Sequence, residues 1–235
     1  MSIASDESFK VWADDETAYG PVDVATVVQW IQDERVFPQT FVQSQSDHFW
    51  RRAGIVEALR EQFPSAVNDV ATASGIGEGS SAGILGELPV FAGLADQALE
   101  QLAALGEFYE VAARDLVVRT GDACDAVYFV LSGELRVRLI VGVVDKQDKT
   151  LCTLGVGEFF GELGMFLQSK RTADVLAECP SRLFRMSTNA FQLVVKQVPD
   201  LAAPILFNIG VTMARRIAED NQRFYREVTS QFLWA

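Results

Sequence analysis

"FFGELGMFLQSKRTADV", residues 159–175, is the most informative stretch of this chain. Gly161 and Glu162 open a short helical turn, and Arg171 stands nine residues after the carboxylate. The N-terminus of such a turn presents unpaired backbone N–H groups and the positive end of a dipole, which favour an anion. Arg171 can donate charge-assisted hydrogen bonds to the same anion, with the bidentate geometry that suits a phosphate.

The residues beside the arginine and the carboxylate fit the same kind of site. Gly161 permits close approach of the backbone, and Thr172 adds a hydroxyl. A carboxylate only accepts hydrogen bonds, so a ribose hydroxyl is a natural partner for Glu162 and a phosphate is not. The pattern therefore predicts a nucleotide-sized site. The alternative is an ion pair between Glu162 and Arg171 in a degenerate pocket that holds no ligand.

The segments around this stretch predict a β-rich fold. Short apolar runs follow one another from residue 107 to residue 187, and turn signals fall at a spacing of about ten residues, as in a jelly roll or barrel. "DKQDKT", residues 145–150, is expected to form a polar hairpin tip. An amphipathic helix is expected before the strands, over residues 95–105.

Helical periodicity returns after the last predicted strand. Thr188 or Asn189 is placed to cap a helix that Pro199 ends. A long helix is then expected from residue 204, with apolar residues along one face at Ile205, Ile209, Met213 and Ile217.

With these motifs in order, residues 85–228 resemble a cyclic nucleotide-binding domain of the catabolite activator protein and kinase regulatory subunit type. "FGELGMFLQSKRTA", residues 160–173, matches the phosphate-binding cassette of that family, and "GD" at 121–122 and "SGEL" at 132–135 match its turn glycines. The resemblance implies that Arg171 holds the cyclic phosphate and that Glu162 holds the ribose 2′-hydroxyl. It also implies that the site is completed by Gly161, Leu163 and Thr172.

The ligand stays open between cyclic GMP and cyclic AMP. Family members that prefer cyclic GMP often carry Thr directly after the arginine, where Thr172 stands. The register of the long helix places Asp220 and Asn221 at the base-contacting positions. A carboxylate there would accept from guanine N1–H and N2–H₂ and would be unpaired against adenine. The other interpretation makes Asp220 a solvated acid on the helix surface.

Residues 1–64 are expected to form a small α+β module. "FKVWAD" alternates like a strand, "AYGPV" is expected to turn, residues 23–36 have helical spacing with Asp23 as the N-cap, and "TFVQS" gives another strand. "GPVDVATVVQW", residues 20–30, resembles the bacterial form of the GYF-type adaptor domain. The position of the GYF tripeptide reads "ERV", so the candidates for a peptide groove, or else for the core, are Trp12, Tyr19 and Trp30.

A flexible linker is predicted over residues 65–84, which are rich in Gly, Ser and Ala. Its "GIGEGSSAG" follows no strand and precedes no Lys-Ser or Lys-Thr pair, so it is not interpreted as a phosphate-binding loop. The domain boundaries are therefore 1–64 for the module, 65–84 for the linker and 85–235 for the nucleotide-binding domain.

Composition limits the classes of function. The net charge of −12 argues against nucleic-acid and membrane partners, and the N-terminus lacks the apolar region of a signal peptide. Three well-separated cysteines, Cys124, Cys152 and Cys179, suit reduced core thiols in a cytosolic protein. His48 is the single histidine, so a metal centre, a Ser-His-Asp triad or an enzyme of the cupin type is not expected.

The predicted fold class is α+β with two domains, namely the GYF-like module and a β-roll, or jelly roll, flanked by helices. The predicted function is a cytoplasmic bacterial sensor and adaptor for a cyclic mononucleotide. We expect no enzyme activity, no cofactor and no metal. Because the long helix is followed by only a short tail, the expected output is protein contact and not DNA binding: an unknown protein partner, a homodimer through the C-terminal helix, or both. The alternative is a degenerate, ligand-free scaffold.

Overall fold

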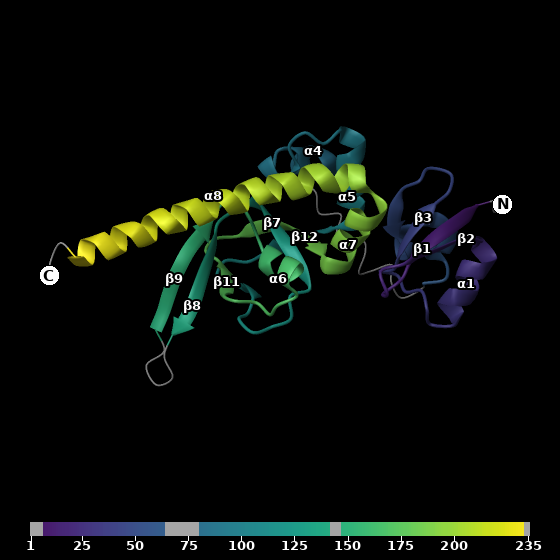
Figure 1. Ribbon diagram of the computed structural model, residues 1–235. Helices are drawn as coiled ribbons and strands as arrows, with labels where there is room; N and C mark the ends of the chain where they lie inside the picture. The colour runs from purple at the N-terminus through teal and green to yellow at the C-terminus, as the bar shows by residue number, and fades with distance from the viewer. Residues whose placement is uncertain (1–6, 64–79, 142–146, 233–235) are drawn as a thin grey trace.

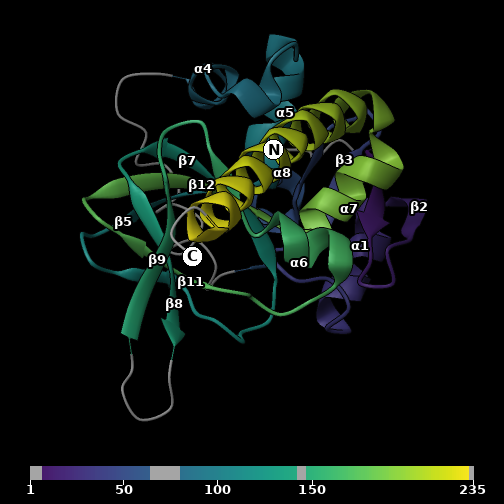
Figure 2. The ribbon, with the colours of Figure 1, turned by 60° about the vertical axis from the view of Figure 1, so that its left-hand side comes forward.

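The computed structural model describes residues 7–63, 80–141 and 147–232. An N-terminal module lies at one end of the molecule, and a β-roll with its helices forms the rest (Figure 1). The long helix α8 (Pro199–Phe232) runs along the roll and extends past the strands β8 and β9. Figures 1 and 2 both place the module beside α7 (Thr188–Gln197).

The module is built on a four-stranded antiparallel sheet in the order β2-β1-β3-β4. Its elements are β1 (Ser8–Trp12), β2 (Ala18–Asp23), α1 (Val24–Gln32), β3 (Phe41–Ser44), β4 (Trp50–Arg52), the 3₁₀ turn η1 (Ala53–Ile55) and α2 (Glu57–Arg60). The predicted cap is present, since the Asp23 side chain accepts from the Thr26 amide at 2.8 Å. The turn predicted for "AYGPV" is wrong, because residues 18–23 pair along β1. The kinship of this module to GYF domains stays a prediction.

The roll consists of two antiparallel four-stranded sheets, in the orders β10-β7-β12-β5 and β6-β11-β8-β9. The strands are β5 (Glu107–Val111), β6 (Leu116–Val118), β7 (Ala126–Ser132), β8 (Leu135–Val141), β9 (Gln147–Leu154), β10 (Phe159–Phe160), β11 (Asp174–Ala177) and β12 (Ser181–Ser187). The β-roll predicted from the strand spacing is thereby confirmed. Residues 147–150 belong to β9 and not to the predicted hairpin tip, whose residues 145 and 146 lie outside the described part of the chain.

Helices flank the roll on the N-terminal side and within its loops: α4 (Ser81–Gly86), the 3₁₀ turn η3 (Pro89–Phe91), α5 (Asp96–Leu105) and α6 (Glu162–Leu167). The predicted linker is therefore too long at its end, since Ser80 caps α4 and Ala82 is buried. Residues 65–79 of that linker lie outside the described residues. The cap of α7 also differs from the prediction, because the Ser187 hydroxyl accepts from the Ala190 amide.

Helix α8 begins at Pro199, five residues before the predicted start, and includes Pro204. Ile205 and Ile209 are each 1% exposed and face the core, whereas Ile217 is 59% exposed, so the predicted apolar face is buried only over its first part. Residues 199–226 are long and apolar enough, by length and composition alone, to cross a membrane. Helices that pack into a protein core pass the same test.

Hydrophobic cores of the module and of the roll meet at one interface. The module has a core of its own, formed by residues such as Phe9, Val27 and Leu59. Trp12, Phe41 and Trp50 instead belong to a cluster that continues into α5, α7, α8 and the roll. These aromatic side chains therefore fix the module to the roll and its helices.

Candidate nucleotide-binding site

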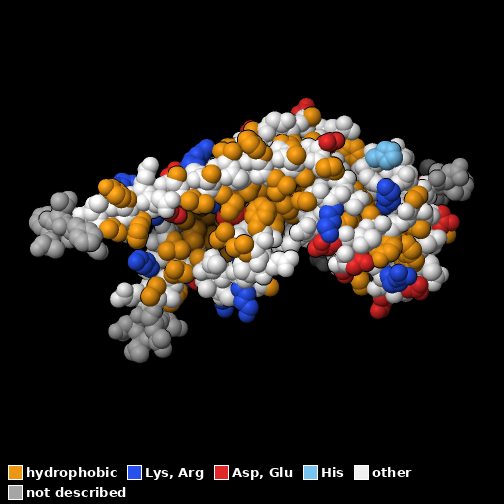
Figure 3. All heavy atoms as spheres, viewed as in Figure 1, with side chains coloured by type: hydrophobic (Ala, Val, Ile, Leu, Met, Phe, Trp, Pro, Cys, Tyr) orange, Lys and Arg blue, Asp and Glu red, His pale blue; other side chains and the backbone are white. Residues whose placement is uncertain are grey.

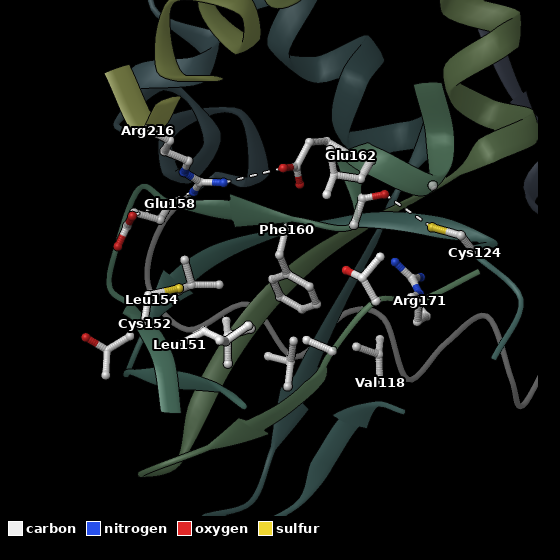
Figure 4. A pocket seen from close by; sticks show the side chains of 18 of the residues that line it. Val118, Cys124, Leu151, Cys152, Leu154, Glu158, Phe160, Glu162, Arg171 and Arg216 are labelled. Carbon is white, nitrogen blue, oxygen red and sulfur yellow. Dashed lines mark hydrogen bonds and ion pairs between the residues drawn. The ribbon is translucent and has the colours of Figure 1, made fainter. Parts of the chain in front are cut away.

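A cavity of about 740 Å³ opens between the roll, α6 and α8 (Figure 4). Its inner wall is apolar and comes from several strands, with Val118, Val137, Leu154, Phe160 and Val175 among the lining residues. Charged groups come from α6, from the loop after it and from α8. This size is within the range of small-molecule sites, about 300–1,000 Å³. An apolar wall facing a few charged groups suits a ligand with a flat ring and an anionic end.

The structure brings most of the predicted binding residues to this cavity. It is lined by Gly161, Glu162, Leu163, Arg171, Thr172 and Asp220. Asn221, the neighbour of Asp220 on α8, is exposed and is not among the lining residues. The first five come from one continuous segment, whereas Asp220 joins them only because α8 packs over the roll.

Gly161 makes the tight entry into α6 possible. Its φ is 88°, in the left-handed region that favours glycine. A Cβ at this position would collide with Nη1 of Arg171 and would lie 2.7 Å from the carbonyl oxygen of Ala126. The absence of a side chain therefore lets the arginine reach the start of α6.

Arg171 is held in place from two sides. Its amide donates to the Asp122 carbonyl at 2.9 Å, and its own carbonyl accepts from the Gly121 amide at 2.8 Å, so the predicted Gly-Asp turn anchors its backbone. Its Nη2 donates to the Ala126 carbonyl at 2.9 Å and to the Asp125 carboxylate at 3.1 Å. Its Nη1 is buried and has no hydrogen-bond partner among the residues that the structure describes. A buried cationic donor without a partner is costly, and an anion in the cavity would satisfy it.

Glu162 is the second buried charge of the site. It is 8% exposed, and burial raises the pKa of its carboxyl above the usual value, against an opposing backbone hydrogen bond and the charges of Arg216 and Arg171. Its ion-pair partner among the described residues is Arg216, with Nη1 3.6 Å from Oε1. The ion pair between Glu162 and Arg171 that a degenerate pocket would contain is therefore not formed.

Helix α8 contributes charged residues that were not predicted from the sequence. Arg216, Glu219 and Arg223 line the cavity together with Asp220. Arg216 also donates to the Phe159 carbonyl at 2.9 Å and lies 3.6 Å from the carboxylate of Glu158. Positions 216, 219, 220 and 223 recur at the spacing of one helical face. This charged periodicity was the signal available in the sequence, beside the apolar stripe of the same helix.

The cysteines differ from the prediction of core thiols. All three are free, Cys152 is exposed, and Cys124 and Cys179 are partly buried. Cys124 and Cys152 line the cavity, and the Cys124 thiol lies 3.2 Å from the Gly161 carbonyl oxygen. Partial desolvation at the cavity wall raises the pKa of both thiols above the usual value for cysteine.

The aromatic residues proposed for a peptide groove of the module are not brought together. Trp12 is 1% exposed and its indole N–H donates to Asn189 of α7 at 2.6 Å. Tyr19 is 45% exposed and donates to Asp15, whereas Trp30 packs against the module's own core beneath Arg35. Peptide binding by these residues stays a prediction.

Comparisons with known proteins agree with the fold. Residues 109–198 match the family model described as "Cyclic nucleotide-binding domain". A crystal structure of a cyclic nucleotide-binding domain from Methylobacillus flagellatus has a TM-score of 0.55 and 20% identity, over 63% of this chain and 82% of that one. The chain therefore contains a cyclic nucleotide-binding domain, which confirms that part of the predicted resemblance.

Two curated relatives show that sequences similar to this chain occur in proteins of different kinds. "Glutaminase 1" of Bradyrhizobium diazoefficiens is 30% identical over 59% of this chain and 22% of its own length. The "cAMP-activated global transcriptional regulator CRP" of Pasteurella multocida is 24% identical over 54% of this chain and 59% of its own length. The chain thus spans about a fifth of the first and about three fifths of the second. The similarity identifies the domain and leaves the activity of the whole protein to be proposed.

Proposed function

We propose that this chain is a sensor of a cyclic mononucleotide, cyclic GMP or cyclic AMP, bound in the cavity between the roll and α8. The observation that carries the proposal is the Nη1 group of Arg171, which is buried at the cavity and has no hydrogen-bond partner in the described part of the chain. A cyclic phosphate would accept from this group while Nη2 keeps its bond to the Ala126 carbonyl.

The remaining groups fit the other parts of such a ligand. Glu162 would accept from the ribose 2′-hydroxyl, which would give the buried carboxylate a hydrogen-bond donor. The apolar strand residues would contact the sugar and one face of the base, and α8 would cover the other side. Arg216 would then share Glu162 with the ribose, so the ligand would connect α6 to α8.

The base is proposed to be guanine slightly more than adenine. Thr172 follows the arginine and lines the cavity, where its hydroxyl is available to a phosphate or a purine. Asp220 lines the cavity from α8. Its side chain is 71% exposed and lies 3.9 Å from Arg223. Its exposure also fits the alternative role of a solvated surface acid. Titration of an Asp220→Ala variant with both nucleotides distinguishes the two roles.

The proposed output is contact with protein and not with DNA, and the proposed location is the cytoplasm. The net charge of −12 supports this, because non-specific attraction to a nucleic acid needs a positive surface. A homodimer through α8 is the proposed assembly. Its support is the set of exposed apolar side chains on that helix, including Phe207, Val211 and Phe224, and Figure 3 shows hydrophobic side chains gathered along α8.

Calorimetric titration of the full chain with cyclic GMP and cyclic AMP tests the proposal. We expect micromolar or tighter affinity for at least one nucleotide, and a loss of about 100-fold in Arg171→Ala, since a buried charged partner contributes about 2–5 kcal/mol. Arg226→Ala is the matched control, because Arg226 is exposed on α8 and does not line the cavity.

Arg171 is buried, so thermal unfolding must show that its variant folds. If it does not, Arg171→Lys keeps the charge and removes the bidentate donor geometry, and we expect weaker nucleotide binding in a folded protein. No heat with either nucleotide in the folded wild-type chain would favour the alternative, a scaffold that holds no ligand.

A further inference from the structure

The N-terminal module contacts the nucleotide-binding domain through polar and apolar groups. Helix α5 packs against β4, and Trp12, Phe41 and Trp50 are each buried in the cluster that spans both domains. Trp12 donates to Asn189 at 2.6 Å. Two ion pairs cross the interface: Arg52 with Glu107 at 2.8 Å, and Lys196 with Glu16 at 2.6 Å.

One of these two ion pairs continues to the cavity. Glu107 of β5 also pairs with Arg185 of β12, at 3.2 Å. Arg185 in turn pairs with Asp125 at 2.6 Å, and Asp125 pairs with Arg171 at 3.1 Å. We call the row Arg52–Glu107–Arg185–Asp125–Arg171 the ion-pair chain. It begins on β4 of the module and ends at the proposed phosphate ligand.

The ion-pair chain alternates in sign and carries one positive charge in excess. It has three guanidinium groups and two carboxylates. Burial acts to raise the pKa of Asp125, but the hydrogen bond from Arg185 and the charges of Arg185 and Arg171 hold it below its usual value. One end of the ion-pair chain is Arg171, whose buried Nη1 has no hydrogen-bond partner among the described residues. A cyclic phosphate, with its single negative charge, would balance the excess positive charge.

We propose that this ion-pair chain couples nucleotide binding to docking of the N-terminal module, with binding at one end strengthening the contact at the other. The inference rests on the proposed function, because it takes a cyclic nucleotide as the ligand of Arg171. A phosphate that draws the guanidinium of Arg171 weakens its pairing with Asp125. Asp125 then pairs more strongly with Arg185. Arg185 therefore pairs less strongly with Glu107, and Glu107 pairs more strongly with Arg52. Linkage requires that docking raise nucleotide affinity by the same factor.

Solvent limits the size of this coupling. The side chain of Asp125 is 59% exposed and that of Glu107 is 37% exposed, whereas those of Arg52, Arg185 and Arg171 are 17%, 23% and 4% exposed. Exposed pairs are screened by water and salt. We therefore expect the low end of the usual allosteric range, about fivefold in affinity.

Two substitutions at the same ion pair give a test with opposite signs. In Arg52→Gln, Glu107 pairs more strongly with Arg185, and Arg185 then pairs less strongly with Asp125. Asp125 therefore holds Arg171 more strongly, and nucleotide affinity should fall about fivefold. In Glu107→Gln, Arg185 pairs more strongly with Asp125. The pairing of Asp125 with Arg171 then weakens, Arg171 is available to the phosphate, and nucleotide affinity should rise. If the Arg52–Glu107 pair served only to dock the module, both variants would change affinity in the same direction. The measurement is calorimetric titration of each full-length variant with cyclic AMP and cyclic GMP.

Two controls separate the ion-pair chain from simpler effects. Glu110→Gln removes a carboxylate from the same strand as Glu107 but outside the chain, and Lys196→Gln breaks the other ion pair of the interface. Neither should change affinity by more than about twofold. Effects of equal size in these controls, equal signs at Arg52 and Glu107, or no effect at either would overturn the inference and leave the proposed function intact. Wild-type protein that binds neither nucleotide would overturn both together.

Discussion

Two charged side chains at the cavity, Arg171 and Glu162, are buried. Among the described residues, Nη1 of Arg171 has no hydrogen-bond partner, and the ion-pair partner of Glu162 is Arg216 at 3.6 Å. Such groups cost stability and persist where they serve a site. Their chemistry matches the two polar ends that a cyclic nucleotide presents, the phosphate and the ribose hydroxyl.

Glu162→Gln should stabilise the unliganded protein at neutral pH by about 1 kcal/mol, the usual gain when a buried site group is removed. Burial raises the folded-state pKa of Glu162 above 4.5, so the folded protein binds the proton more tightly than the unfolded chain. The wild-type free energy of unfolding therefore decreases as pH rises from 4.5 through the folded pKa. Chemical denaturation of both proteins across this range measures the difference.

The advantage of the Gln variant should disappear as the pH approaches 4.5, because the protonated acid and the amide then have the same charge. Arg216 keeps Glu158 as a partner at 3.6 Å, so the substitution does not leave it unpaired. A difference that does not vary with pH, or a variant less stable than wild type, would contradict the role assigned to burial. Weaker binding of both nucleotides by the same variant is the functional counterpart.

Among the elements, α8 performs two tasks along its length. Its first turns bury Ile205 and Ile209 in the core, and a later segment turns charged residues toward the cavity. Arg216 lies between these parts and connects α8 to the start of α6. It pairs with Glu162, the first residue of α6, and with Glu158 in the preceding loop. Displacement of α8 would therefore change the cavity and the position of the exposed apolar side chains of the helix together.

Asp220→Ala tests whether α8 selects the base. If the carboxylate accepts from guanine, the substitution should weaken cyclic GMP binding by about tenfold and leave cyclic AMP binding unchanged or slightly tighter. Competitive titration of both nucleotides measures the ratio. Gln222→Ala, at an exposed position of α8 that does not line the cavity, is the matched control. An unchanged ratio would assign Asp220 to the solvated surface of the helix.

For the whole molecule, the main feature is that the module and the roll share a hydrophobic cluster. Trp12 and Trp50 meet edge to face, with ring centroids 6.4 Å apart, and both are buried against the nucleotide-binding domain. The module nevertheless keeps a core of its own around Phe9 and Val27. This combination allows the module to dock as a unit, which is what the proposed coupling requires.

Trp12→Ala should lower the free energy of unfolding by about 3–5 kcal/mol, the cost of removing a large buried side chain. It also removes the donor to Asn189 and loosens the module, so denaturation followed by fluorescence and by circular dichroism should no longer give coincident transitions. Trp30→Ala is the control, because Trp30 is only partly buried and lies on α1 of the module. Equal losses in both variants would contradict a specific role for the interface.

Several elements were predictable because their signals are local. The Asp23 cap, the helix before the strands and the strand runs of the roll depend on residues a few positions apart, and they agree with the structure. The errors lie where tertiary contacts override local patterns. "AYGPV" pairs along β1 despite its turn residues, and the end of the Gly-rich linker folds into α4 because Ala82 and Leu85 are buried.

By itself the sequence determined the cassette, since Gly161, Glu162, Arg171 and Thr172 lie within twelve residues and their spacing specifies their chemistry. Only the tertiary structure decided which groups face them from α8 and what the module's tryptophans contact. Trp12 and Asn189 are 177 positions apart, and Arg52 reaches the roll through Glu107. Contacts between such distant positions leave no periodic pattern in the chain, because they arise only when separate elements pack together.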